Sequence, residues 1–107
     1  MKLEERVRLN ELFDAYGCLL SSTQKEITSE FLNYDLTFSE IADNRNVSRQ
    51  ASFITFKHCV KKLEDFEAKL GIIKHKTKER ELKKEVLTLL KSGNVDNAIK
   101  KIESEEG

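Results

Sequence analysis

The stretch TFSEIADNRNVSRQASFI, residues 37–54, decides the fold. Two helix starts lie eleven residues apart in it: Thr37, which has Glu40 three positions later, and Ser48. A threonine followed three residues later by a glutamate is typical of a capping box, in which each side chain accepts a hydrogen bond from the other residue's backbone N–H. A short helix, a sharp turn and a second helix in this order predict a helix-turn-helix, the unit that lays its second helix in the DNA major groove.

Three residues inside this stretch support the motif, and two depart from it. Ala42 is small, as the close crossing of two helices requires, and Asn46 can take the left-handed turn where glycine is usual. We expect Val47 to fill the core after the turn. Arg45 stands where an apolar residue is usual, and Ser52 stands where a β-branched residue is usual.

The composition favours an all-α fold. Of the 107 residues, 36% are charged and 38% are apolar, there is no proline, and only four glycines occur. A sheet protein of this size would need more turn residues. No apolar run approaches the ~18 residues of a membrane-spanning helix, and the N-terminal MKLEERVRLNELF lacks the apolar segment of a signal peptide. We therefore expect a cytoplasmic protein built from helices.

Apolar residues repeat every three or four positions in six segments, which predicts six helices. We expect Gly17, inside the first helix, to mark the close approach of another helix, and Gly71 to end the fourth helix. The acidic end, ESEEG, should fray. The expected helices cover about residues 3–20, 22–32, 37–45, 48–70, 77–91 and 95–102.

These helices divide into two expected domains. Residues 1–71 form a helix-turn-helix domain that includes the long fourth helix, and residues 72–107 form a C-terminal helical hairpin. The apolar stripes of the hairpin are larger than a lone four-helix unit needs. We therefore predict a homodimer in which the hairpin or the end of the fourth helix contributes to the interface.

The residues that usually carry catalysis or bind metals form no recognisable arrangement. Cys18 and Cys59 lie on apolar helical stripes, so we expect both thiols to be reduced and buried. His58 and His75 lack the spacing of metal ligands. There is no nucleophile–base pairing and no glycine-rich phosphate loop, so we expect neither an enzyme nor a bound cofactor or metal.

A net charge of zero hides an uneven charge distribution. The net charge is −5 over residues 1–44, +2 over residues 45–56, +5 over residues 57–84 and −2 over residues 85–107. The basic middle can attract phosphates. Glutamates interleave with the basic residues of its second half, which favours a solvated helix face there over a phosphate site.

The second helix of the motif carries the candidate site. Arg49 and Gln50 can read base edges or hold phosphates. Phe53 and Ile54 are apolar, and we expect them to contact the core or a protein partner. The candidate nucleic-acid contacts are Ser48, Arg49, Gln50, Lys57 and Lys61.

The order of three segments, ELFDAYGCLLSSTQKEI, LTFSEIADNRNVSRQA and KKLEDFEAKLGI, resembles the YlxM-like family of small bacterial proteins. The family pattern has an ELF-x-x-YG-x-LL start, an L-S-x-S-E-I-A helix, a V-S-R-Q-A recognition helix and a LEEYE-x-KLG end. The resemblance covers about residues 11–72. Its helix-turn-helix is similar to region four of bacterial sigma factors, which implies an all-α, sigma-region-four-like or winged-helix-like bundle.

The resemblance also implies a function. It implies Ser48, Arg49 and Gln50 as nucleic-acid contacts and a regulatory role in the signal recognition particle pathway. The ligand would be promoter DNA or the particle's RNA, and the particle's GTPase would be a further partner. The alternative is a protein–protein interaction module that has lost sequence-specific DNA reading. Phe53 and Ile54, which replace a more polar run of the family pattern, favour this alternative.

Overall fold

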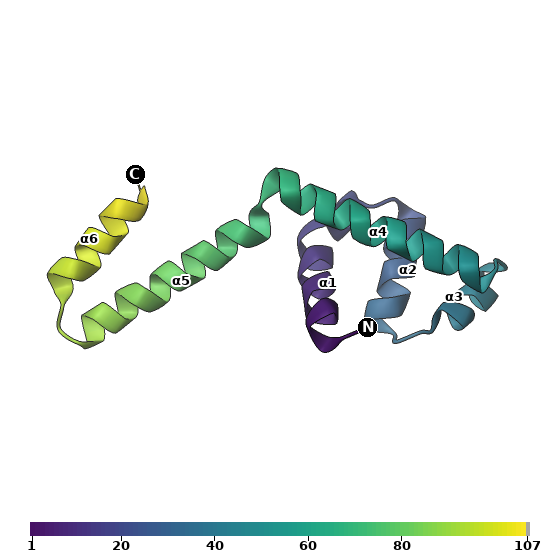
Figure 1. Cartoon of the computed structure of the whole chain (residues 1–107), viewed down its shortest axis with the longest axis horizontal. Helices are drawn as coiled ribbons and strands as arrows, with labels where there is room; N and C mark the ends of the chain where they lie inside the picture. The colour runs from purple at the N-terminus through teal and green to yellow at the C-terminus, as the bar shows by residue number, and fades with distance from the viewer. Residues whose placement is uncertain (107) are drawn as a thin grey trace. The chain divides into compact units, whose positions relative to one another are not determined.

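The computed structural model describes residues 1–106, and all regular secondary structure in this range is helical (Figure 1). The expected all-α fold is confirmed. Residues 1–71 form one compact unit, and the residues from Ile72 onward form a second. The helices are α1 Leu3–Tyr16, α2 Ser22–Asn33, α3 Phe38–Arg45, α4 Arg49–Leu70, α5 Ile72–Lys91 and α6 Val95–Glu106.

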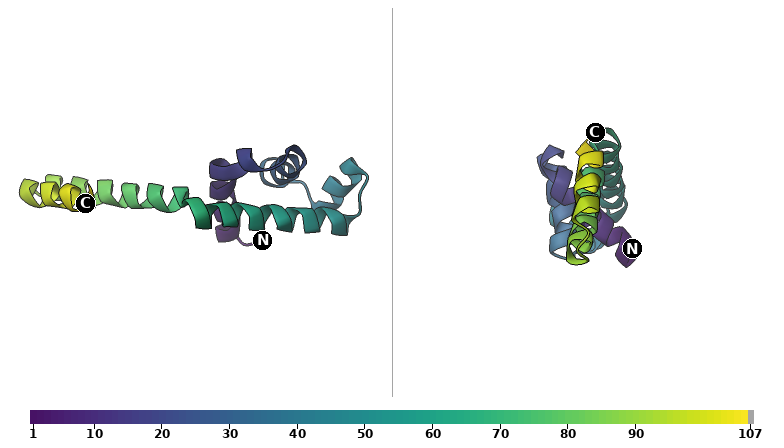
Figure 2. Two further views of the ribbon diagram at one scale, coloured as in Figure 1. Left: turned by 90° about the horizontal axis from the view of Figure 1, so that it is seen from above. Right: turned by 90° about the vertical axis from the view of Figure 1, so that its left-hand side faces the viewer.

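In the first unit, α1, α2 and α3 pack on the long helix α4, with α3 beside the end where α4 begins (Figures 1 and 2). An aromatic cluster joins α2, α3 and α4. The ring centroid of Phe31 lies 4.6 Å from that of Phe56 and 5.2 Å from that of Phe38. Other buried side chains in this core are Leu12, Tyr16, Ile27, Ile41, Cys59 and Leu63.

Polar contacts fix α1 along the second half of α4. Tyr16 is fully buried, and its hydroxyl donates a 2.5 Å hydrogen bond to Oε1 of Glu67. A second contact joins the same two helices, since Nη2 of Arg8 lies 3.1 Å from Oε2 of Glu64. Because a buried carboxyl group must keep its hydrogen-bond partner, the Tyr16–Glu67 contact sets the register of the two helices.

The first helix is shorter than the sequence predicts. It ends at Tyr16, and a 3₁₀ turn at Gly17–Leu19 follows. Three residues per turn in place of 3.6 rotate the side chains away from the apolar stripe, so Cys18 and Leu19 are exposed. The expectation that both cysteines are buried is therefore wrong for Cys18 and confirmed for Cys59.

Gly17 faces an aromatic ring of its own chain segment, and the expected close approach of another helix at this glycine is wrong. A Cβ atom added to Gly17 would lie 2.9 Å from two ring carbons of Phe13. The ring of Phe13 thus occupies the space that any larger side chain at this position would need.

In the second unit, α5 and α6 pack against each other as a helical hairpin (Figure 1). Helix α5 begins at Ile72, directly after Gly71, and the expected start near Thr77 is wrong. The Thr77 hydroxyl donates a 3.0 Å hydrogen bond to the carbonyl of Ile73, which is a bond of a helix interior and not of a cap.

The last helix is longer than the sequence predicts, since α6 continues to Glu106 and the expected end lay near residue 102. Lys101 supports this end of the helix, since its ammonium group lies 3.0 Å from a carboxylate oxygen of Glu85 and 3.4 Å from one of Glu105. Gly107, the last residue of the expected frayed segment, lies outside the described residues.

Candidate nucleic-acid interface

Local hydrogen bonds build the helix-turn-helix as the sequence predicts. Oγ1 of Thr37 accepts a 3.1 Å hydrogen bond from the backbone N–H of Glu40, whose carboxylate accepts one from the N–H of Thr37 at 3.2 Å. Asn46 has the left-handed conformation, with φ 55° and ψ 43°. Oγ of Ser48 accepts a 3.0 Å hydrogen bond from the N–H of Ala51, so α4 begins at Arg49.

Arg45 joins α3 to α2 and is not part of the exposed site. Its guanidinium lies 2.9 Å from Oε1 of Glu30 and 3.2 Å from Oε2 of Glu26. The hydrogen bond to Glu30 is the main cause that raises the pKa of Arg45 above its ordinary value. The arginine at a usually apolar position of the motif is therefore explained by an ion pair that fastens α3 to the bundle.

Ser52 occupies the crossing of α3 and α4. It is 1% exposed, and its Oγ lies 2.9 Å from the carbonyl oxygen of Phe38 and 2.8 Å from that of Arg49. A serine has one hydroxyl proton, so these two carbonyl groups share it or accept it in turn. Ser52 thus keeps the two helices close without the β-branched residue that the motif usually has at this position.

Val47 does not fill the core after the turn, and that expectation is wrong. Its side chain is 46% exposed. The space between the helices is already filled by the aromatic cluster, in which the ring centroids of Phe38 and Phe56 lie 5.2 Å apart. Val47 therefore adds an apolar group to the exposed surface at the start of α4.

The exposed face of α4 carries most of the predicted site residues. Arg49, Gln50, Phe53, Ile54 and Lys57 have positions that a helix places on one side, and all five are exposed. The opposite side carries the buried residues, among them Ser52, Phe56 and Cys59. Lys61, one turn beyond Lys57, is exposed as well.

This face is positively charged without any neighbouring acid in the sequence. Residues 44–63 contain five basic residues and no aspartate or glutamate. Two of the five are used within the fold: Arg45 forms the ion pairs above, and Nζ of Lys62 lies 3.4 Å from Oε1 of Gln24. The other three, Arg49, Lys57 and Lys61, form no ion pair with the described residues. They are therefore available to phosphates.

Two apolar side chains lie in the middle of the same face. Phe53 is 40% exposed and packs edge-on against Phe38, with ring centroids 5.2 Å apart. Nζ of Lys57 lies 5.5 Å from the centroid of the Phe53 ring. Ile54 is 45% exposed. The contact with Phe38 thus holds one side of the Phe53 ring, while Ile54 remains exposed.

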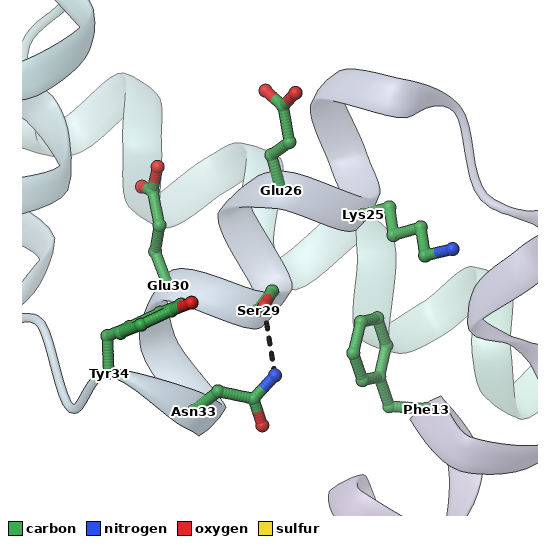
Figure 3. Close-up of a pocket in the computed structure, with 7 residues that line it drawn as sticks. All are labelled: Phe13, Lys25, Glu26, Ser29, Glu30, Asn33 and Tyr34. Carbon is green, nitrogen blue, oxygen red and sulfur yellow. Dashed lines mark hydrogen bonds between the residues drawn. The ribbon is translucent and has the colours of Figure 1, made fainter.

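A pocket of about 430 Å³ lies elsewhere in the first unit (Figure 3). Two of its carboxylates already bind Arg45, and Nδ2 of Asn33 donates a 2.9 Å hydrogen bond to Oγ of Ser29. No predicted site residue lines it. The lining residues are Phe13, Lys25, Glu26, Ser29, Glu30, Asn33 and Tyr34.

Residues 1–106 contain neither a cluster of metal-ligating side chains nor a membrane-spanning helix. No group of three or more histidine, cysteine, aspartate or glutamate side chains could hold a metal ion. None of the helices has both the length and the apolar character that crossing a membrane requires.

Comparison with known proteins gives the family. The model of a family described as "Putative helix-turn-helix protein, YlxM / p13 like" matches residues 3–104. A UPF0122 protein of Clostridium perfringens is 36% identical over 100 residues, which cover 92% of this chain and 89% of the relative. One of Fusobacterium nucleatum is 38% identical, covering 97% of this chain and 98% of the relative. One of Bacillus velezensis is 43% identical, covering 85% of this chain and 79% of the relative. The chain therefore belongs to the UPF0122 family of YlxM/p13-like helix-turn-helix proteins.

Proposed function

We propose that this protein binds nucleic acid through the exposed face of α4 and acts as a helix-turn-helix regulator. The observation that carries the proposal is the acid-free stretch of residues 44–63, on which Arg49, Lys57 and Lys61 are exposed and form no ion pair with any described residue. Exposed cations with no internal partner can exchange their counterions for phosphates.

The start of α4 adds backbone donors to this face. The N–H groups in the first turn of a helix have no partner within the helix, and the helix dipole favours an anion there. Ser48 uses its Oγ as acceptor for the Ala51 N–H, which leaves its hydroxyl proton to donate. Ser48 and Arg49 therefore suit a phosphate contact, and Gln50 suits a base contact.

A salt titration tests the proposal. With three or more basic residues in reach of phosphates, the log–log dependence of affinity on salt should have a slope of roughly −2 to −4 on duplex DNA. Arg49→Ala should weaken binding to duplexes of different sequence alike and make the slope shallower by about 1, as the loss of one phosphate contact predicts. Binding that is independent of salt and unchanged in Arg49→Ala would rule out this interface.

A second candidate function uses the same face for a protein partner. The observation that favours it is the group of exposed apolar side chains Val47, Phe53 and Ile54 at one end of the bundle. On this proposal Phe53→Ala abolishes binding of the partner and leaves the helix content and nucleic-acid binding intact.

We further propose that the protein acts in the signal recognition particle pathway. The family resemblance suggests a role with the signal recognition particle, either on its RNA or on its GTPase. Co-purification from cells with and without nuclease treatment separates the possibilities. Nuclease-sensitive recovery supports an RNA or DNA ligand, nuclease-resistant recovery of the GTPase supports the interaction module, and recovery of neither counts against this pathway.

We also propose that the hairpin formed by α5 and α6 joins two copies of the chain. Helix α5 has no fully buried residue, and Ala98 is the one buried side chain among those described in α6. A segment of fewer than about 40 residues rarely holds a fold without a further support such as oligomerisation. The exposed apolar residues available for an interface are Ile72, Leu87, Leu90, Val95, Ile99 and Ile102.

A further inference from the structure

The middle of the exposed α4 face is apolar, although both of its ends are polar or charged. Arg49 and Gln50 precede the pair Phe53 and Ile54, and Lys57 follows it, all on one side of the helix. The pair is 40% and 45% exposed, respectively. Any ligand that fits the whole face must offer anions at the edges and an apolar group between them.

The major groove of B-DNA fits this description. Its edges are rows of phosphates, and its floor carries one strongly apolar group, the C5-methyl group of thymine. The other base edges in the groove are hydrogen-bond donors and acceptors, which an isoleucine or a phenylalanine cannot satisfy and would desolvate. A side chain of this kind in the groove is therefore favourable only beside a thymine methyl.

We propose that Ile54, supported by Phe53, contacts thymine methyl groups, so that the target of this protein is duplex DNA with thymine at a defined place in its site. This inference rests on the proposed function, because it assigns a ligand to the same α4 face. Phe53 is held by its edge contact with Phe38 and by Lys57 above its ring. Phe53 lies beside the methyl group, and Ile54 is the residue that approaches it.

The helix geometry places this thymine relative to the other base contacts. Gln50 and Ile54 are one turn apart on α4, which corresponds to ~6 Å along the helix axis. Base pairs are ~3.4 Å apart, so the thymine lies about one or two base pairs from the base that Gln50 reads. Glutamine pairs best with adenine in the major groove. The preferred site should therefore contain an adenine and, about one or two base pairs away, a thymine.

The same contact selects DNA over RNA. Uracil lacks the C5-methyl group, and the major groove of A-form RNA is too deep and narrow for a helix to read. The particle's RNA would then bind only through phosphate contacts, with no contribution from Ile54.

Replacing thymine by deoxyuridine tests the proposal, since this change removes the methyl group and leaves base pairing intact. Duplexes selected from a random library by the full-length protein are resynthesised with deoxyuridine at each thymine in turn, and affinity is measured by fluorescence anisotropy. One or two neighbouring positions should each lose affinity about fourfold, as the burial of one methyl group predicts. 5-Methylcytosine opposite guanine at the same position should restore part of the loss.

Substitutions at Ile54 test whether this residue causes the preference for thymine over deoxyuridine. Ile54→Ala should bind the thymine and deoxyuridine duplexes equally, while Ile54→Val keeps part of the discrimination. Leu19→Ala is the matched control, because Leu19 is 48% exposed and lies on another element; it should discriminate like the unmodified protein. Circular dichroism establishes that each variant is folded.

The remaining outcomes separate this inference from the proposed function. Salt-dependent binding without any sequence enrichment, or with equal affinity for thymine and deoxyuridine, overturns the methyl contact and leaves nucleic-acid binding in place. Discrimination that persists in Ile54→Ala also overturns it. Failure to bind any duplex overturns the proposed function together with the inference.

Discussion

Two arginines four positions apart have different environments, and this difference gives a paired prediction at the scale of single residues. Arg45 is bound to Glu26 and Glu30, whereas Arg49 is exposed and forms no ion pair with the described residues. Arg45→Ala should lower the free energy of unfolding in urea by about 1 kcal/mol, because its side chain is 21% exposed and each carboxylate loses a partner. Arg49→Ala should leave stability unchanged and weaken DNA binding. Equal effects of the two substitutions on both measurements would contradict these assignments.

The two cysteines give a second prediction at the residue scale. Burial raises the pKa of the Cys59 thiol, so thiolate is scarce at this position at neutral pH, and the side chain is closed to reagents as well. Cys18 is exposed in the 3₁₀ turn. Iodoacetamide labelling followed by mass spectrometry should therefore modify Cys18 within minutes and Cys59 only after urea is added. Equal native rates at both positions would show that Cys18 is covered or that the core opens readily.

At the scale of elements, the turn of the motif depends on a single left-handed residue. Asn46 has φ 55° and sits between the capped helices α3 and α4. Alanine in this conformation costs ~1–2 kcal/mol, so Asn46→Ala should lower the free energy of unfolding by about that amount, while Asn46→Gly should change it little. Urea denaturation of the two variants makes the comparison. An Asn46→Ala variant as stable as Asn46→Gly would mean that the turn tolerates another conformation.

The elements also show which features could be predicted from the sequence. The capping box of Thr37 and Glu40, the turn at Asn46 and the cap at Ser48 were predictable because each depends on residues no more than five positions apart. The end of α1 at Tyr16 was missed, although Gly17 follows directly and glycine is common after the last residue of a helix.

In the candidate site, too, some features could be predicted from the sequence and others could not. The helical period alone places the predicted contacts on one face of α4. The roles of Arg45 and Val47 depend instead on what neighbouring helices offer: two glutamates of α2 bind the arginine, and aromatic rings fill the space expected for the valine. Contacts of this kind join residues distant in sequence, and no local pattern encodes them.

At the scale of the whole molecule, the two compact units differ in whether they have a buried core of their own. The first has a closed core around Tyr16, Ile41 and Leu63. The second exposes Leu90 and Ile99 by 46% and 48%. Exposed apolar side chains at helical spacing on two packed helices suit burial in a helical bundle with a second hairpin. The favourable free energy of dimerisation should therefore come from the hairpin, while the first unit folds around its own core.

The oligomeric state of the protein tests whether the hairpin of α5 and α6 forms a dimer interface. Sedimentation equilibrium at ~100 µM should find a homodimer, since an interface of ordinary size with micromolar affinity is populated at that concentration. Ile99→Glu should shift the protein to monomer, because a carboxylate in an apolar interface is costly to desolvate. Leu19→Glu, a change of equal chemistry at an exposed residue of the first unit, is the control and should leave the dimer intact. A monomer at ~100 µM for the unmodified protein would contradict the prediction. If the Ile99→Glu variant is a dimer and the Leu19→Glu variant is a monomer, the interface lies in the first unit and not in the hairpin.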